Sequence, residues 1–203
     1  RQTLPDGMTL EIGFDQSENV SNRINSFSSS LIQGILLVGL AILAAVGFRA
    51  ALIVMIAIPT SFMIGIGFSY YTGYGLHQMT ITGLIVALGL LVDNAIVVTE
   101  SSVRFQISGL DRKEAVVRGA TEVGWPMASS TLTTVLAFIP IVLMPGDAGD
   151  FIRSMPVAVI YTLGASLFVA LTLTPLLASA ILPRIHRETR FQTHLHHFVE
   201  TRY

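Results

Sequence analysis

Five long apolar stretches constrain the fold of this chain more than any other feature of its sequence. Each reaches or nearly reaches the roughly 20 residues that a helix needs to cross about 30 Å of hydrocarbon. Backbone polar groups in lipid must be paired within the protein, so these stretches predict helices rather than an open sheet. We therefore expect an all-α polytopic membrane protein with a five-helix transmembrane bundle. The stretches are Leu31–Phe48, Ala50–Tyr71, Met79–Val98, Pro126–Met144 and Val157–Leu182, within expected helices at about 31–48, 50–71, 79–105, 123–144 and 157–182.

The composition supports this class and argues against several others. The mean hydropathy is +0.67 and only 12% of the residues are charged, against about 25% in soluble domains. A net charge of −1 argues against a nucleic-acid partner, which requires a basic surface. The sequence has no cysteine, and it contains no metal-ligand spacing, nucleophile motif or phosphate-binding loop. We expect no enzymatic activity, no cofactor and no metal.

The distribution of Lys and Arg predicts the orientation in the membrane. Nine of these residues lie in the first and third connections between the apolar stretches or after the last stretch, which share one side of the membrane. The other three lie on the opposite side. By the positive-inside rule the N-terminus is external and the C-terminus cytoplasmic. Because no signal peptide opens the chain, this orientation predicts a further span upstream, and hence a piece of a larger membrane protein. The nine are Arg49, Arg104, Arg112, Lys113, Arg118, Arg184, Arg187, Arg190 and Arg202; the three are Arg1, Arg23 and Arg153.

The two ends and one connection differ from the apolar stretches. Residues 1–22 are expected to be the end of an external domain, because Met8–Asp15 alternates apolar and polar residues as a half-buried strand does. Residues 183–203 have the spacing of an amphipathic helix on the cytoplasmic membrane surface. Between the third and fourth stretches, Asp111 and Glu114 form a capping pattern that predicts the start of a short cytoplasmic helix.

Asp93 is the only formal charge in the five apolar stretches, and Asn94 follows it. An aspartate near the centre of a membrane helix costs roughly 2.5–3.5 kcal/mol and is usually functional. Asp93 lies about 21 Å along the helix from Met79, between the midplane and the cytoplasmic third. Gly89 is one turn away on the same face, so we expect other helices, rather than lipid, to surround the acid. Glu100, two turns further on this face, would lie at the cytoplasmic exit.

Two interpretations of this pair follow. In the first, Asp93 and Asn94 hold helices together by hydrogen bonds to a hydroxyl such as that of Thr131, Thr133 or Thr134. In the second, Asp93 is a proton-relay group with Asn94 beside it, since burial favours the neutral carboxyl and a nearby cation favours the ionised one. No apolar stretch contains Lys, Arg or His. A countercharge would therefore come from outside this chain.

Four segments resemble the resistance–nodulation–division (RND) efflux transporters, in particular the hydrophobe/amphiphile exporters of Gram-negative inner membranes. The most specific is GLIVALGLLVDNAIVVTES, and the resemblance covers about residues 24–182. It implies that the chain corresponds to helices two to six of a twelve-helix protomer, half of the transmembrane domain, with residues 1–22 closing a periplasmic porter domain. The segments are Gly83–Ser101, Lys113–Ile141, Leu171–Leu182 and Phe48–Pro59.

The resemblance also implies a function and partners. RND multidrug exporters work by substrate/H⁺ antiport, commonly as homotrimers with a periplasmic adaptor and an outer-membrane channel. Asp93 matches the first acid of the family's acidic pair, whereas Asn94 stands where multidrug exporters usually have a second aspartate. The family's lysine partner lies on the tenth helix, in the second half of the transporter. Two alternatives without drug efflux remain: a sterol- or lipid-sensing bundle and a protein-export accessory.

Overall fold

The computed structural model describes residues 16–182, with side chains from residue 24 onward. Within that range the chain forms helices and no strand, and five segments are long and apolar enough to cross a membrane. The all-α prediction is thereby confirmed. The strand expected at Met8–Asp15 and the helix expected at 183–203 lie outside the described residues. The helices are α1 (Gln16–Ala45), α2 (Phe48–Tyr71), α3 (Gln78–Ile107), α4 (Arg112–Val142), α5 (Asp147–Ile152), α6 (Ser154–Leu171) and α7 (Leu173–Ile181).

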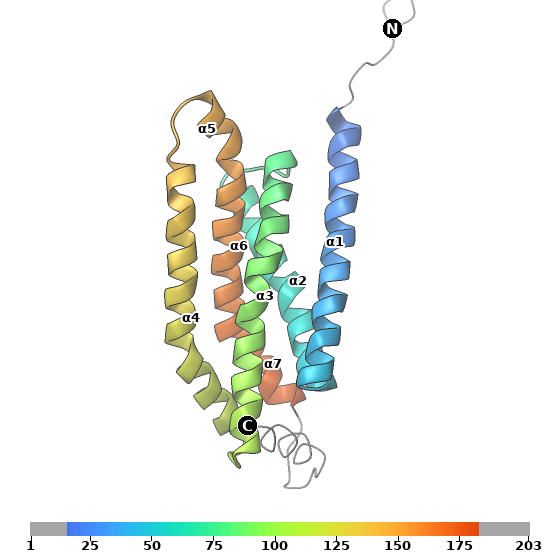
Figure 1. The fold of residues 1–203 in the computed structure, drawn as a ribbon, viewed down its shortest axis with the longest axis vertical. Helices are drawn as coiled ribbons and strands as arrows, with labels where there is room; N and C mark the ends of the chain where they lie inside the picture. Colours follow the sequence, from blue (N-terminus) through green and yellow to red (C-terminus); the bar gives the residue numbers. More distant parts are fainter. Residues whose placement is uncertain (1–15, 183–203) are drawn as a thin grey trace, which may run out of the picture.

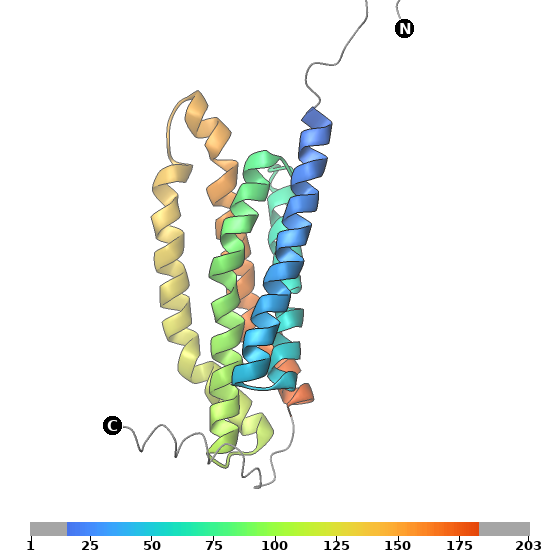
Figure 2. The ribbon, with the colours of Figure 1, turned by 45° about the vertical axis from the view of Figure 1, so that its right-hand side comes forward.

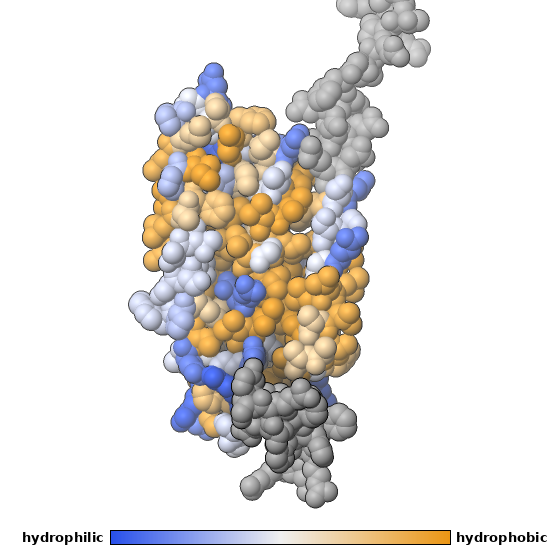
Figure 3. Space-filling model, in the orientation of Figure 1, coloured by the Kyte–Doolittle hydropathy of each residue, from blue (hydrophilic) through white to orange (hydrophobic). Residues whose placement is uncertain are grey.

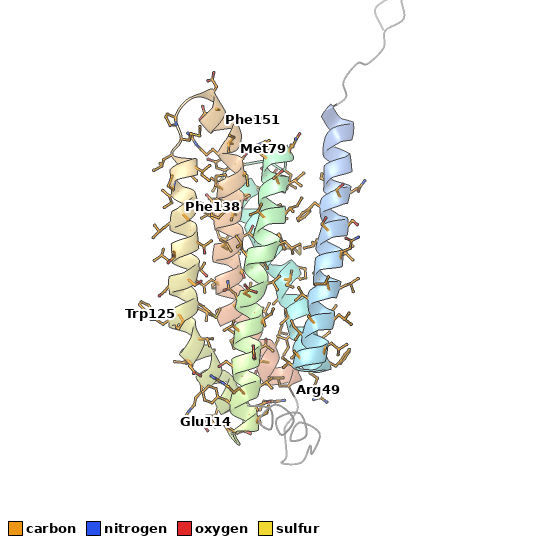
Figure 4. All side chains as sticks on the ribbon, in the orientation of Figure 1. Arg49, Met79, Glu114, Trp125, Phe138 and Phe151 are labelled. Atoms are coloured by element: carbon orange, nitrogen blue, oxygen red, sulfur yellow. The ribbon has the colours of Figure 1, made fainter. Side chains whose placement is uncertain are left out.

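The helices run up and down beside one another (Figures 1 and 2). The chain turns between α1 and α2 at Gly47, whose φ of +117° lies in the region that favours glycine. Arg49 and the start of α4 lie at this same end of the bundle (Figure 4). The short α5 connects α4 to α6 at the opposite end. On the face drawn in Figure 3, apolar side chains cover most of the surface between the two ends, as expected for helices surrounded by lipid.

Helix α3 is the centre of the bundle and packs against α1, α2, α4, α6 and α7. Its buried face includes Leu84, Leu91 and Val98, which are spaced by two helical turns. Glycines allow the neighbouring backbones to approach: a Cβ atom on Gly65 of α2 would lie 2.7 Å from Thr162 Oγ1 of α6. Helix α1 lies at the edge of the bundle and packs on α2 and α3 (Figures 1 and 2).

The last expected helix, 157–182, is divided into α6 and α7. The break falls at Thr172, whose φ of −118° and ψ of −66° depart from helical values. Pro175 explains its position, because proline has no N–H to donate to the carbonyl four residues earlier and its ring collides with that carbonyl. The residue four positions earlier is Leu171, at which α6 ends.

The connection between α3 and α4 differs from the expected short separate helix. Residues from Arg112 onward form the first turns of α4, which continues to Val142. Asp111 occupies the N-cap position, but its side chain makes no capping hydrogen bond; Glu114 instead forms an ion pair with Arg118 at 3.4 Å. Pro126 removes one hydrogen bond without ending the helix, and α4 changes direction in that region, near Trp125 (Figure 4).

Helix α1 begins at Gln16 and therefore starts earlier than the expected span at residue 31. The part apolar enough to cross a membrane is Ile24–Ala45. The first turns of α1 thus extend into residues 1–22. That these residues close an external domain stays a prediction.

Candidate functional site

Asn94 lies at the interface between α3 and α6 and forms a hydrogen bond across it. Its side-chain amide Nδ2 donates a hydrogen bond to Ser166 Oγ at 3.2 Å, and Ser166 Oγ donates to the Leu91 carbonyl at 3.0 Å. Ser166 is buried, with 2% of its surface exposed. One buried hydroxyl therefore bridges the side chain of Asn94 and the backbone one turn earlier on the same helix.

Sequence reasoning missed Ser166. The available signal was a single serine in the apolar run LGASLFVAL of the last stretch. An isolated hydroxyl in a membrane helix usually finds a partner on a neighbouring helix, but the sequence does not indicate which one.

Asp93 faces a different direction from Asn94 and is exposed on the surface of the bundle. Within the described residues no helix covers the carboxyl group; that other helices surround it stays a prediction. Consecutive helical residues are about 100° apart, so when Asn94 faces α6, Asp93 faces away from it. Gly89, one turn earlier, also lies open, because a Cβ atom there would meet nothing within 4 Å.

The Asp93 carboxylate lines a groove of about 410 Å³ between α1 and α3. The α1 side of this groove includes Ser30, Gln33 and Gly34, and the α3 side includes Gly89. Within residues 24–182 no basic side chain forms an ion pair with Asp93. The site is thus a carboxylate beside a partly polar groove, without a countercharge from the described part of the chain.

The three threonines considered as hydrogen-bond partners do not contact the pair in this way. Thr133 Oγ1 donates to the Ser129 carbonyl at 2.9 Å and Thr134 Oγ1 to the Ser130 carbonyl at 3.1 Å, both within α4. Thr131 is buried on the same helix and has no hydrogen bond to Asp93 or Asn94. The interhelical hydrogen bond that the structure shows joins Asn94 to Ser166 of α6.

Glu100 lies two turns beyond Asp93 and is exposed. It lines a cavity of about 170 Å³ together with Ser101, Arg104 and Val123. The Arg104 guanidinium donates to Glu122 Oε2 at 2.7 Å, so this arginine is paired with α4 rather than with Glu100. A supporting role of Glu100 stays a prediction.

Residues 24–182 bring together no group of three or more His, Asp or Glu side chains that could hold a metal ion. The histidines of the C-terminal tail lie outside that range. The described site offers a carboxyl group at Asp93 and hydrogen-bonding side chains at Asn94 and Ser166.

Comparison with known proteins places the chain in a family. The model of the AcrB/AcrD/AcrF family matches residues 1–203. "Multidrug resistance protein MdtC" of Klebsiella pneumoniae (strain 342) is 32% identical over 193 residues, 94% of this chain and 19% of that protein.

Two further relatives of the same name give similar values. MdtC of Yersinia pestis bv. Antiqua (strain Angola) is 33% identical and MdtC of Shigella flexneri 32% identical, each over 183 residues, 90% of this chain and 18% of the relative. The chain spans about a fifth of the length of the curated relatives it matches. It belongs to the AcrB/AcrD/AcrF family of RND efflux transporters.

Proposed function

We propose that this chain is the proton-coupling part of an RND pump that exports substrates by antiport with H⁺, and that Asp93 is the group that takes up and releases the proton. The observation that carries this proposal is the contrast between two neighbours on α3. Asn94 is fixed by Ser166 in the α3–α6 interface, whereas Asp93, the sole charge in the apolar stretches, is open to a groove.

The exposure of Asp93 supports a site that is completed by another part of the transporter. A carboxylate at this depth that faced hydrocarbon would cost several kcal/mol. The face of α3 that carries Asp93 and Gly89 therefore requires a polar neighbour. The RND resemblance supplies one, a lysine from the second half of the protein. Docking of that half would bury the carboxyl group beside a cation.

The link from Asp93 to movement would run through α3. Protonation removes one charge from this helix and weakens its attraction to a cation on the other half. Each charge that crosses the membrane is worth about 2.3 kcal/mol per 100 mV, enough to bias two packings of similar stability. Asn94, Ser166 and Leu91 join α3 to α6, so α6 would follow a shift of α3. Because Asn94 carries no proton to exchange, this helix offers one titrating group where family members usually have two.

The location and partners follow from the same proposal. We place the protein in the Gram-negative inner membrane with the N-terminal end of α1 on the periplasmic side, as the distribution of Lys and Arg predicts. The intact transporter would be a homotrimer that works with a periplasmic adaptor and an outer-membrane channel. Its substrates would be drugs, as the name "multidrug resistance protein" indicates for the MdtC relatives.

The test is Asp93→Asn in the full-length transporter, expressed in cells that lack their own RND pumps. We expect energised efflux of a fluorescent drug to be lost while the amount of protein in the membrane is unchanged, because the amide keeps the shape of the side chain but not its proton chemistry. The matched control is Asp147→Asn, the same substitution at an exposed carboxylate of α5, away from α3. Normal efflux by Asp93→Asn would refute the proposal and favour a lipid-sensing or accessory role for the bundle.

A further inference from the structure

The groove beside Asp93 is polar on its α1 side. Gln33 and Ser30 line it, and Ser29 and Ser26 continue the same face toward the N-terminal end of α1 at a spacing of three to four residues. Ser29 and Gln33 are exposed, and Gln33 Nε2 donates to Ser29 Oγ over 3.5 Å. Asp93 is the only titratable residue among those that line the groove.

The depth of these residues follows from one contact. A Cβ atom on Gly34 would lie 3.0 Å from Leu88 Cδ2, so these two positions of α1 and α3 are at the same level. The two helices run in the same direction (Figure 1). Asp93 is five residues beyond Leu88, about 7.5 Å deeper, and Ser30 is four residues before Gly34, about 6 Å nearer the N-terminal end. The groove therefore extends from Ser30 down to the carboxyl group.

The position of Gln33 favours water over lipid in this groove. It is near the centre of the membrane-crossing part of α1, Ile24–Ala45. A primary amide in hydrocarbon leaves donors and acceptors unpaired, which costs several kcal/mol, and the one hydrogen bond that Gln33 makes in the described chain is long. Gln33, with serines on the same face nearer the N-terminal end of α1, provides the polar groups that water requires on the way to the carboxylate.

We propose that the α1–α3 groove is the hydrated entry route by which protons reach Asp93 from the N-terminal side of α1, with Ser30 and Gln33 as its polar lining. This inference rests on the proposed function, since it assigns the path to the proton site named there. Leu37 and Val38 line the groove on α1 about 4.5 and 6 Å deeper than Gly34, between Gln33 and the carboxyl group. The route ends at Asp93 because Asp93 is the deepest of the residues that line the groove. Release on the other side requires a different arrangement of the helices.

The first experiment measures whether water reaches the groove and does not depend on transport. Single cysteines are introduced into a cysteine-free full-length transporter and treated from outside with a membrane-impermeant, cationic methanethiosulfonate. We expect Ser30→Cys and Gln33→Cys to react at least about tenfold faster than controls, because the thiolate that attacks the reagent and displaces its sulfinate forms in water and not in lipid. The controls are Ile32→Cys and Leu36→Cys, at matched depth but outside the groove lining.

The second experiment tests whether this water carries the proton. Gln33→Leu should slow proton uptake by transporters in liposomes by about tenfold, whereas Gln33→Asn, which keeps the amide, should stay within about twofold, because only the former removes a hydrogen-bonding group from the path. Equal labelling of all four cysteines, or unchanged proton uptake by Gln33→Leu, would refute the route.

Failure of the proposed proton route and failure of the proposed function give different results. If the groove cysteines react no faster than the controls while Asp93→Asn still abolishes efflux, the proton route lies elsewhere and the proposed function stands. If they react faster but Asp93→Asn exports normally, the groove is hydrated without serving a proton site, and both the route and the proposed function fall.

Discussion

The side-chain amide of Asn94 on α3 and the hydroxyl of Ser166 on α6, two residues that are 72 positions apart in the chain, are joined by a 3.2 Å hydrogen bond. Because Ser166 also donates to the Leu91 carbonyl, the bond fixes the rotation of α3 relative to α6. That rotation directs the neighbouring Asp93 away from α6 and toward α1. The direction of the carboxylate is thus set by a neighbour that does not titrate.

Replacing Ser166 with Ala should weaken the packing of α3 on α6. Interhelical hydrogen bonds in membranes contribute about 0.6 kcal/mol on average and up to about 1.7 kcal/mol, and the bridge involves two bonds. We expect the free energy of unfolding of the full-length transporter in detergent to fall by about 1–2 kcal/mol. Ser179→Ala, which removes a hydroxyl that bonds only within α7, should change it by less than about 0.5 kcal/mol. An equal effect of the two substitutions would contradict the bridge.

Asn94→Asp should add a second titrating group beside Asp93. The new carboxylate has no proton to donate to Ser166, so the serine hydroxyl would turn from the Leu91 carbonyl to the carboxylate. We expect the number of protons exchanged per substrate to rise, measured from the reversal of transport at imposed pH gradients and voltages. An unchanged ratio would show that this position does not take part in proton exchange.

Gly65→Ala should destabilise the bundle, whereas Gly67→Ala should not. A Cβ atom at Gly65 would lie 2.8 Å from the Thr162 Cα atom, a backbone atom that cannot move away by a change of rotamer. At Gly67 a Cβ atom would meet nothing within 4 Å. Overpacking of this kind costs about 1–3 kcal/mol. The exposed Gly67 is expected to gain slightly from the better helix propensity of alanine. Unfolding midpoints of the two variants in detergent provide the measurement, and a lower midpoint for Gly67→Ala than for Gly65→Ala would contradict the packing of α2 on α6.

Arg112→Ala should loosen the end of α7. Arg112 Nη1 donates to the carbonyls of Ala180 and Leu182 at 3.3 and 3.2 Å, and Arg49 Nη1 donates to the Ile181 carbonyl between them at 3.3 Å. A cation at the C-terminal end of a helix pairs with its free carbonyls and with the helix dipole.

The measurement for this variant is hydrogen exchange of the amide of Leu182, which donates to the Ala178 carbonyl. We expect its exchange to become about five- to tenfold faster, a loss of about 1 kcal/mol of local stability. Lys113→Ala removes a neighbouring exposed cation from the same turn of α4 and should leave the exchange rate unchanged. Unaltered exchange in Arg112→Ala would mean that Arg49 alone holds the end of α7.

The number and approximate position of the membrane helices could be predicted because the evidence for them is local. Eighteen to 26 consecutive apolar residues require a helix wherever they are placed in a bilayer, so α2 and α3 were recovered closely from runs of sequence. The break between α6 and α7 was not predicted: Pro175 explains where it falls, but Pro59, Pro126 and Pro140 lie within continuous helices, so a proline alone does not locate a break. The sequence also located Asp93 on α3 and identified the absence of a partner for it within the apolar stretches.

The direction in which each helix faces was decided only by the tertiary structure. In a membrane, lipid and protein interior are similarly apolar, so the pattern along α3 does not distinguish the side that packs on α6 from the side that lies open. Small residues occur on both, near Asn94 and near Asp93. Contacts between segments far apart in the chain, above all the bond from Asn94 to Ser166, determine that the amide lies at the helix interface and the carboxylate at the groove. Such contacts depend on how whole helices fit together, so a short stretch of sequence does not predict them.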